Sequence, residues 1–293
     1  MTFRSGIVAV VGRPNVGKST LVNALVGRKV AIVSDKPQTT RRGLRAVLTS
    51  GEAQVVFTDT PGFHKPRTEL GARLNDVVGD AVEGVDAILH VVDAAAGIGR
   101  GDAFVFEQRV RPHRCPKLCV VNKVDVTGHH EVVPQLAQAA ELGDYDEIVP
   151  VSAKTGSGIE HLRGLVLELL PESPPLYPPE TLTDQPLEDR LAEIVREKAL
   201  MVTRQEVPHS ITVMVEELEL EEGLATIHAS LIVERGSQKG IVIGKGGQTL
   251  RTIGARAREE MELVLGRKVF LDLRVKVVKE WQRDPKALER LGY

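Results

Sequence analysis

The segment from Gly12 to Ser19 contains the residue types and spacing that most clearly indicate chemistry. It reads Gly-Arg-Pro-Asn-Val-Gly-Lys-Ser and matches the pattern Gly-x-x-x-x-Gly-Lys-[Ser/Thr] of a phosphate-binding loop. Glycines let backbone N–H groups converge on a polyphosphate, because no Cβ blocks the approach. Lys18 would reach the β- and γ-phosphates, and the Ser19 hydroxyl would bind Mg²⁺. The expected contact residues are Asn15, Val16, Gly17, Lys18, Ser19 and Thr20.

A carboxylate and a threonine loop are expected to complete a metal site beside this segment. Asp59 ends a predicted strand within Asp-Thr-Pro-Gly, and an acid at this place can organise Mg²⁺, mainly through a bound water. Gly62 can donate its N–H to a γ-phosphate. Thr39 and Thr40 lie in a polar loop, where the Thr40 hydroxyl can close over Mg²⁺ once a γ-phosphate is present. Either segment alone would be an ordinary turn or surface loop, but their order along the chain favours the metal site.

The tetrapeptide Asn-Lys-Val-Asp at 122–125 is expected to select the base. The Asp125 carboxylate can accept hydrogen bonds from both N1–H and the N2 amine of guanine, a match that adenine cannot offer. Asn122 would tie the base-binding loops together, and the Lys123 stem would lie along the ring. In a later segment, the Ala153 N–H can donate to guanine O6. The expected contacts with a GTP or GDP base are Asn122, Lys123, Asp125, Ser152, Ala153 and Lys154.

These residues require parallel strands that end at one edge of a sheet. Apolar runs typical of strands predict them at 7–11, 44–49, 53–58, 86–93, 117–121 and 148–151. Helices are predicted at 20–26, 70–83, 102–110 and 162–170. Each motif follows a strand, and this order is the signature of a TRAFAC-type GTPase domain. The prediction for residues 1–170 is therefore an α/β, doubly wound P-loop GTPase domain with its nucleotide at the carboxyl ends of the strands.

A proline-rich stretch separates this domain from a second one. The six prolines from Pro171 to Pro186 predict a semi-rigid, extended linker at 171–186. The remaining residues, 187–293, predict a helix at 187–200, strands at 211–218 and 224–233, a glycine loop, a helix at 248–265 and a strand at 269–278. The order α-β-β-α-α-β is that of a smaller α+β domain, the type II KH domain, here with a C-terminal extension.

The glycine loop of the second domain is expected to bind RNA. Gly244-Lys245-Gly246-Gly247 fits the Gly-x-x-Gly loop that clamps four nucleotides of a single strand. Residues 231–293 carry 14 Lys/Arg and 8 Asp/Glu, a balance of +6, whereas residues 181–230 carry 4 and 11, a balance of −7. A simple turn between helices is the alternative, but the element order and the basic charge favour RNA. The expected RNA contacts are Lys239, Gly244, Lys245, Gly246, Gly247, Arg251, Arg256 and Arg258.

A GTPase domain followed by a KH domain resembles the Era family over nearly the whole chain. Further matching segments are Gln38 to Arg41, Asp59 to Pro66, Glu206 to Ser210, Ile241 to Gly247 and the ending Leu291-Gly292-Tyr293. The resemblance implies a bacterial GTPase that acts in assembly of the small ribosomal subunit (30S) and maturation of 16S rRNA. It implies binding to the 3′ end of 16S rRNA, and association of some members with the inner face of the membrane. Related GTPases with Asn at the place of Asn15 can bind K⁺ there.

Other function classes are weaker matches to the sequence. A membrane-associated regulatory GTPase without an RNA target would need a lipidation motif or anchor, and the sequence contains neither. A metabolic kinase would need a substrate pocket in place of the KH domain. Phe63 stands where Ras-like proteins carry the Gln that orients water, so slow intrinsic hydrolysis is expected and no general base is assigned. Without an apolar span or leader, a cytoplasmic protein is expected, and a monomer.

Overall fold

The chain folds into two compact units in a computed structural model that describes residues 2–36, 38–66, 68–203 and 207–293. The first unit comprises Met1–Val33, Thr40–Arg67 and Gly71–Asp184. The second comprises Ser34–Thr39, Thr68–Leu70 and Gln185–Tyr293. Glu206 of the predicted 206–210 motif lies outside the described residues.

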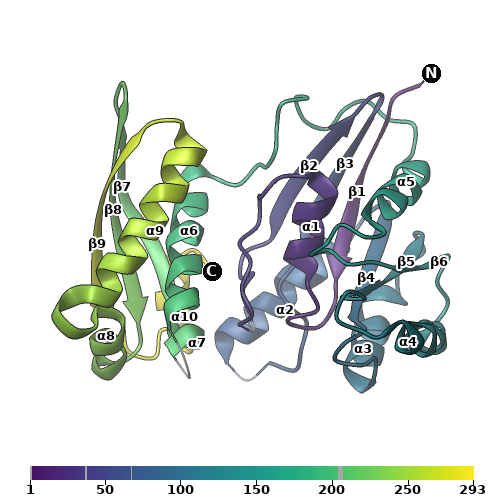
Figure 1. Cartoon of the computed structure of the whole chain (residues 1–293), viewed down its shortest axis with the longest axis horizontal. Helices are drawn as coiled ribbons and strands as arrows, with labels where there is room; N and C mark the ends of the chain where they lie inside the picture. Colours follow the sequence, from purple (N-terminus) through teal and green to yellow (C-terminus); the bar gives the residue numbers. More distant parts are fainter. Residues whose placement is uncertain (1, 37, 67, 204–206) are drawn as a thin grey trace. The chain divides into compact units, whose positions relative to one another are not determined.

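A six-stranded sheet forms the centre of the first unit (Figure 1). Its strands are β1 (Arg4–Val11), β2 (Leu44–Ser50), β3 (Ala53–Asp59), β4 (Ala87–Asp93), β5 (Lys117–Asn122) and β6 (Glu147–Pro150). The spatial order is β2-β3-β1-β4-β5-β6, with β2 and β3 antiparallel and the other neighbours parallel. All the parallel strands thus end at one edge, where the predicted motifs follow β1, β3, β5 and β6.

Helices cover both faces of this sheet. They are α1 (Lys18–Val26), α2 (Glu69–Ala81), α3 (Arg100–Val105), the π-helix η1 (Phe106–Val110), α4 (His129–Leu142) and α5 (Ile159–Leu169). Alternation along β1 explains the two layers: Val8 and Val10 pack with α1 and α5, whereas Ala9 and Val11 pack on the face of α2 and α3. A strand buried on both faces needs apolar residues at every position, as predicted. The doubly wound α/β fold is confirmed.

The proline-rich segment has extensive contacts with the first unit. The Ser5 hydroxyl donates to the Pro174 carbonyl at 2.6 Å. The Gln54 side chain accepts from the backbone N–H groups of Leu176 and Tyr177 at 2.8 and 2.9 Å, and donates to the Tyr177 carbonyl at 2.8 Å. Val47 of β2 donates to Leu182 at 2.9 Å. These hydrogen bonds attach residues 171–184 to the strands β1, β2 and β3.

The second unit contains a three-stranded sheet with helices packed against it (Figure 1). Its elements are α6 (Leu187–Val202), α7 (Val207–Ser210), β7 (Thr212–Leu220), β8 (Leu224–Val233), α8 (Gly236–Ile243), the 3₁₀ turn η2 (Lys245–Gly247), α9 (Gln248–Leu265), β9 (Lys268–Val277) and α10 (Pro285–Arg290). The central strand β8 pairs antiparallel with β7 and parallel with β9. Apart from the short α7 and the terminal α10, this is the predicted α-β-β-α-α-β order.

The helices of the second unit pack through narrow apolar stripes. Ile253, Ala257 and Met261 recur every four residues on α9 and are fully buried, in one core with Leu231 of β8.

The C-terminal extension is also folded. Trp281 is buried, donates its indole N–H to the Ser210 carbonyl at 3.0 Å and stacks on the Tyr293 ring with centroids 5.7 Å apart.

Candidate functional site

The phosphate-binding loop lies between the buried strand β1 and helix α1. Gly17 ends it with φ 96°, a conformation that side chains with a Cβ rarely adopt. A Cβ on Gly17 would also lie 2.4 Å from Nδ2 of Asn122. Both facts require glycine at this position. Val16 is buried in the core under the loop, Asn15 is exposed with φ 65°, and Thr20 is half-buried in the first turn of α1.

Lys18 lies under the loop with its ammonium directed at backbone carbonyls. Its Nζ donates to the carbonyls of Gly12 at 3.1 Å and Arg13 at 2.9 Å. Burial lowers the pKa of Lys18 from 10.5 to about 8, and the negative charge of Asp59 partly opposes this. A buried ammonium that donates to two neutral carbonyls, with one carboxylate nearby, is electrostatically prepared for an anion. A polyphosphate would supply that charge.

Three oxygen-bearing side chains meet beside Lys18. The Ser19 hydroxyl donates to Asp59 Oδ2 at 2.7 Å and lies 2.8 Å from the Thr40 hydroxyl, which itself donates to Asp59 Oδ2 at 3.1 Å. Asp59 is fully buried, and burial raises the pKa of its carboxyl. Its Oδ1 has no hydrogen-bond partner among the described residues. An unpartnered buried carboxylate oxygen beside two hydroxyls fits a hard cation such as Mg²⁺. Thr39 is not part of this cluster, because its hydroxyl donates to the Lys36 carbonyl at 2.7 Å.

The segment after Asp59 packs against the phosphate-binding loop. A Cβ on Gly62 would lie 2.6 Å from backbone atoms of Pro14, so this close approach requires glycine. The Phe63 N–H donates to the Gly12 carbonyl at 3.2 Å. Its ring is buried, stacks on Phe104 at 5.3 Å and has the Arg109 guanidinium 4.4 Å from its centroid. The Phe63 side chain is therefore part of the packing and offers no polar atom to a water.

The predicted base-binding segments are joined by Asn122. Its side-chain amide donates to the Val16 carbonyl at 2.9 Å, and its Oδ1 accepts from the Ala153 N–H at 3.0 Å. The Ser152 hydroxyl donates to Asp125 Oδ1 at 2.7 Å, which orients a carboxylate that is exposed to solvent. Asn122 thus ties the loops together as the sequence predicted. The contact of the Ala153 N–H with guanine O6 stays a prediction; this N–H already donates to Asn122 and must share or exchange that bond to reach the base.

Lys123 also makes contacts that the sequence did not predict. The predicted position of its stem along the base stays a prediction, but its ammonium is engaged elsewhere. Nζ donates to the Asn15 carbonyl at 2.6 Å and to Asp93 Oδ2 at 2.6 Å, and the residue has φ 68°. Lys123 therefore links the base-binding loop to the phosphate-binding loop. Lys154 is exposed after β6.

The predicted RNA-binding loop joins α8 to α9 in the second unit. Three glycines adopt the left-handed region there: Gly244 with φ 73°, Gly246 with φ 59° and Gly247 with φ 79°. The Lys245 side chain is exposed, and the Arg251 guanidinium donates to the Gly246 carbonyl. Backbone N–H groups at the start of α9 and two cations thus lie at one exposed turn, which suits a phosphate.

The other predicted RNA contacts are distributed more widely. Arg251 and Arg258 are exposed and lie two turns apart on α9, so they share one side of the helix. Arg256 is exposed on the opposite side of the buried stripe through Ala257. Lys239 is half-buried on α8. The structure therefore groups Lys245, Arg251 and Arg258, and separates Arg256 from them.

Several residues that hold the predicted nucleotide-binding loops in place were not identified from the sequence. Arg13 bonds to Asp102 at 2.7 Å, and Asp93 accepts from Lys123. Asp93 ends a predicted buried strand, which is a signal of the same kind as Asp59. Arg13 occupies a variable position of the loop pattern, and no local signal marks Asp102.

Known proteins resemble the chain over both units. Family models match it at residues 7–123, described as a 50S ribosome-binding GTPase, and at residues 206–282, described as a KH domain. GTPase Era of Mycobacterium tuberculosis is 50% identical over 297 residues, covering 99% of each chain. GTPase Era of Nocardioides sp. is 48% identical over 301 residues, covering 99% of this chain and 96% of its own.

Solved structures agree with these relatives. A crystal structure of Era in complex with MgGDPNP and nucleotides 1506–1542 of 16S ribosomal RNA matches with a TM-score of 0.96 and 42% identity, covering 99% of each chain. An Aquifex aeolicus Era variant bound to GDP and AlF₄⁻ matches with the same values. Fold and site together define a P-loop GTPase domain joined to a KH domain. At 50% identity to GTPase Era over 99% of its length, the chain belongs to the Era family.

Proposed function

We propose that this chain binds GTP and GDP with Mg²⁺, hydrolyses GTP to GDP and phosphate, and binds RNA at the 3′ end of 16S rRNA during 30S assembly. The observation that carries the enzymatic half is the meeting of Ser19, Thr40 and Asp59 beside the buried Lys18. The Era complex with MgGDPNP and a 16S rRNA fragment supports both halves of the proposal.

The residues present fit Mg²⁺. The hydroxyls of Ser19 and Thr40 would be direct ligands, Thr40 only in the GTP state, and Asp59 would act mainly through a bound water. When bound, the ion neutralises charge on the β- and γ-phosphates. Lys18 would exchange its loop carbonyls for phosphate oxygens, and Gly62 would donate its N–H to the γ-phosphate.

Hydrolysis without a partner is proposed to be slow. Phe63 is packed between Phe104 and Arg109, so it cannot orient the attacking water. His64 is the neighbouring residue, and no role as a general base is assigned to it. It is half-buried, and its Nδ1 lies 2.9 Å from the Lys65 carbonyl of its own loop. A K⁺ ion at the exposed Asn15 would supply positive charge at the phosphates. Equal turnover in K⁺ and Na⁺ buffers would remove potassium from the mechanism.

The second unit is proposed to bind single-stranded RNA through its glycine loop. The exposed Lys245, the Arg251 guanidinium and the N-terminus of α9 present positive charge beside a backbone without Cβ atoms at Gly246 and Gly247. The loop geometry favours a phosphodiester backbone but not a particular sequence. The 3′ end of 16S rRNA is therefore proposed as the target from the family and from the Era complex.

Location and assembly are proposed from the sequence and the family resemblance. Among the described residues, no helix combines the length and the apolar character that crossing a bilayer demands. A cytoplasmic monomer is proposed from the sequence. Peripheral association with the inner membrane face stays a prediction from the family resemblance.

Base specificity tests the enzymatic half of the proposal. Asp125→Asn replaces one carboxylate oxygen with an amide, so guanine binding should weaken by about 3 kcal/mol, or about two decades in affinity, and xanthine should be favoured. Titrations with fluorescent GTP, ATP and xanthosine triphosphate measure this. If the wild-type chain binds ATP as tightly as GTP, the GTPase proposal is wrong.

A further inference from the structure

The loop between β4 and α3 is fastened to the phosphate-binding loop at both ends. At its start, Asp93 accepts from Lys123 Nζ at 2.6 Å, and the same Nζ donates to the Asn15 carbonyl at 2.6 Å. Asp93 Oδ1 also accepts from the N–H groups of Ala95 and Ala96 at 2.9 and 3.1 Å, which fixes the turn that follows. One end of this loop is therefore held to Asn15 through Lys123.

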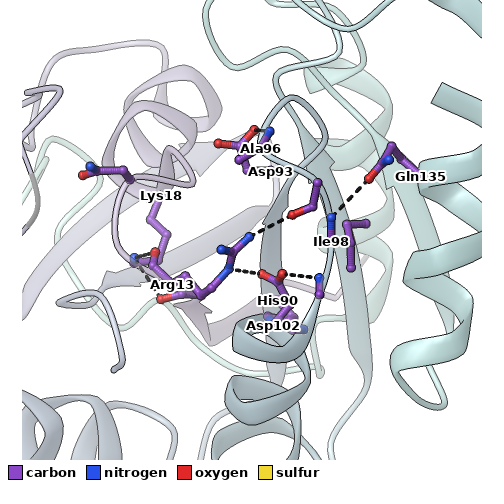
Figure 2. A network of polar contacts seen from close by, with 12 residues as sticks. Arg13, Lys18, His90, Asp93, Ala96, Ile98, Asp102 and Gln135 are labelled. Atoms are coloured by element: carbon purple, nitrogen blue, oxygen red, sulfur yellow. Dashed lines mark hydrogen bonds and ion pairs between the residues drawn. The ribbon is translucent and has the colours of Figure 1, made fainter. Parts of the chain in front are cut away.

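Arg13 holds the other end. Its Nε donates to Asp102 Oδ1 at 2.7 Å and its Nη2 donates to the Gly97 carbonyl at 3.1 Å, as Figure 2 shows. The second oxygen of Asp102 accepts from the Gly99 N–H at 2.9 Å, so both carboxylate oxygens are paired. Asp102 is fully buried, whereas the Arg13 side chain is 30% exposed. A buried carboxylate requires such a charge partner, because removing the partner leaves the charge stranded.

The surrounding packing is shaped for the Arg13 side chain. A Cβ on Gly101 would lie 2.5 Å from Arg13 Cδ, so a larger residue there would displace the side chain. The backbone of Arg13 has a task of its own, because its carbonyl accepts from Lys18 Nζ at 2.9 Å. The residue whose side chain is anchored on Asp102 thus presents one of the two carbonyls that hold the Lys18 ammonium.

We propose that Arg13 and Asp102 form a positioning pair that fixes the phosphate-binding loop in its nucleotide-binding shape. The inference rests on the proposed GTP and GDP binding. Arg13 acts through the loop backbone and Lys18, not by touching the reacting atoms. The backbone N–H groups of such a loop cradle the α- and β-phosphates, which GDP and GTP share. The pair therefore contributes to the affinity for both nucleotides.

The test measures GDP and GTP affinity of the full-length chain. Arg13→Ala and Asp102→Asn should each weaken the binding of both nucleotides about 5- to 30-fold. Arg13→Lys keeps the positive charge but not the planar guanidinium that donates in two directions. This variant should therefore recover part of the lost nucleotide affinity. The double variant should lose about as much as either single variant, because both remove one interaction.

Arg111→Ala is the matched control, because Arg111 pairs with Glu107 at 2.8 Å on an exposed surface of the same unit. It should bind both nucleotides as wild type does. The proposal would be overturned if a folded Arg13→Ala or Asp102→Asn protein had only a lower melting temperature and kept both nucleotide affinities within twofold of wild type. A loss confined to GTP, or losses that multiply in the double variant, would also overturn it. Failure of the wild-type chain to bind GTP would instead refute the proposed function.

Discussion

The Asn122 side-chain amide donates to the Val16 carbonyl at 2.9 Å, across 106 positions of sequence. Because its Oδ1 also accepts from the Ala153 N–H at 3.0 Å, one buried side chain connects the phosphate-binding loop to both base-binding segments. Phosphate and base recognition are therefore parts of one hydrogen-bonded unit. Gly17 is required in this arrangement, since its missing Cβ leaves the space that Asn122 Nδ2 occupies.

Asn122→Ala should weaken both stability and nucleotide binding. The substitution leaves the Val16 carbonyl and the Ala153 N–H without this partner, and an unsatisfied buried polar group costs about 1–3 kcal/mol. We expect the free energy of unfolding in urea to fall by about 2 kcal/mol or more and GDP affinity to fall more than tenfold. Unchanged values of both would show that the three loops are independent.

Thr40→Ala should separate GTP from GDP. The Thr40 hydroxyl contacts Ser19 and Asp59, and it is expected to join Mg²⁺ only when a γ-phosphate is present. GTP affinity and hydrolysis should fall about tenfold or more, while GDP affinity stays within about twofold. Thr39→Ala is the control, because the Thr39 hydroxyl donates to the Ser34 and Lys36 carbonyls of its own loop. Equal losses for both nucleotides would remove Thr40 from the γ-phosphate site.

Nucleotide affinity should decrease above about pH 8. The pKa of Lys18 is about 8 in the free protein, and a bound polyphosphate favours the charged form and raises it. Binding above pH 8 therefore requires uptake of a proton, so GDP affinity should be flat below about pH 7.5 and fall by up to about tenfold per unit above pH 8. Calorimetry in buffers of different ionisation enthalpy would detect the proton. A flat affinity up to pH 9.5 would contradict the assignment.

The nucleotide motifs could be predicted because they are local in sequence. A buried strand followed by glycines and a helix start specifies its own geometry, as at β1 and α1, and alternation of Val8 and Val10 with Ala9 and Val11 matches the two-faced sheet. Helix α4 was not predicted. Leu136, Ala139 and Leu142 do lie on one face and pack in the core, but Pro134 stands inside the helix, and an internal proline argues against a helix in the sequence.

Other parts of the structure depend on contacts between distant residues. The proline-rich segment was predicted as a linker from composition, but Gln54 is 123 positions from Tyr177 and their hydrogen bonds could not be read locally. The same holds for Arg13 and Asp102, which are 89 positions apart. The hydrogen bond from the Ala153 N–H to Asn122, 31 positions away, likewise could not be read locally.

GTP and RNA are expected to bind at separate sites on one chain. Replacing Lys245 and Gly246 with Asp puts carboxylates where an RNA backbone would approach. Lys245 is exposed, a Cβ on Gly246 meets no atom within 4 Å, and Asp tolerates the left-handed conformation better than most residues, so the fold should survive. Lys286→Asp, a charge reversal on the exposed surface of α10, is the control.

Two titrations of this double variant show whether the sites are separate. One uses labelled single-stranded RNA and the other a fluorescent GTP analogue. RNA affinity should fall well over tenfold, since fewer counterions are released when phosphate contacts are reversed, and GTP affinity should stay within about twofold. The control should keep both affinities. Unchanged RNA binding by the folded double variant would contradict the RNA site in the second unit and the ribosomal role that depends on it.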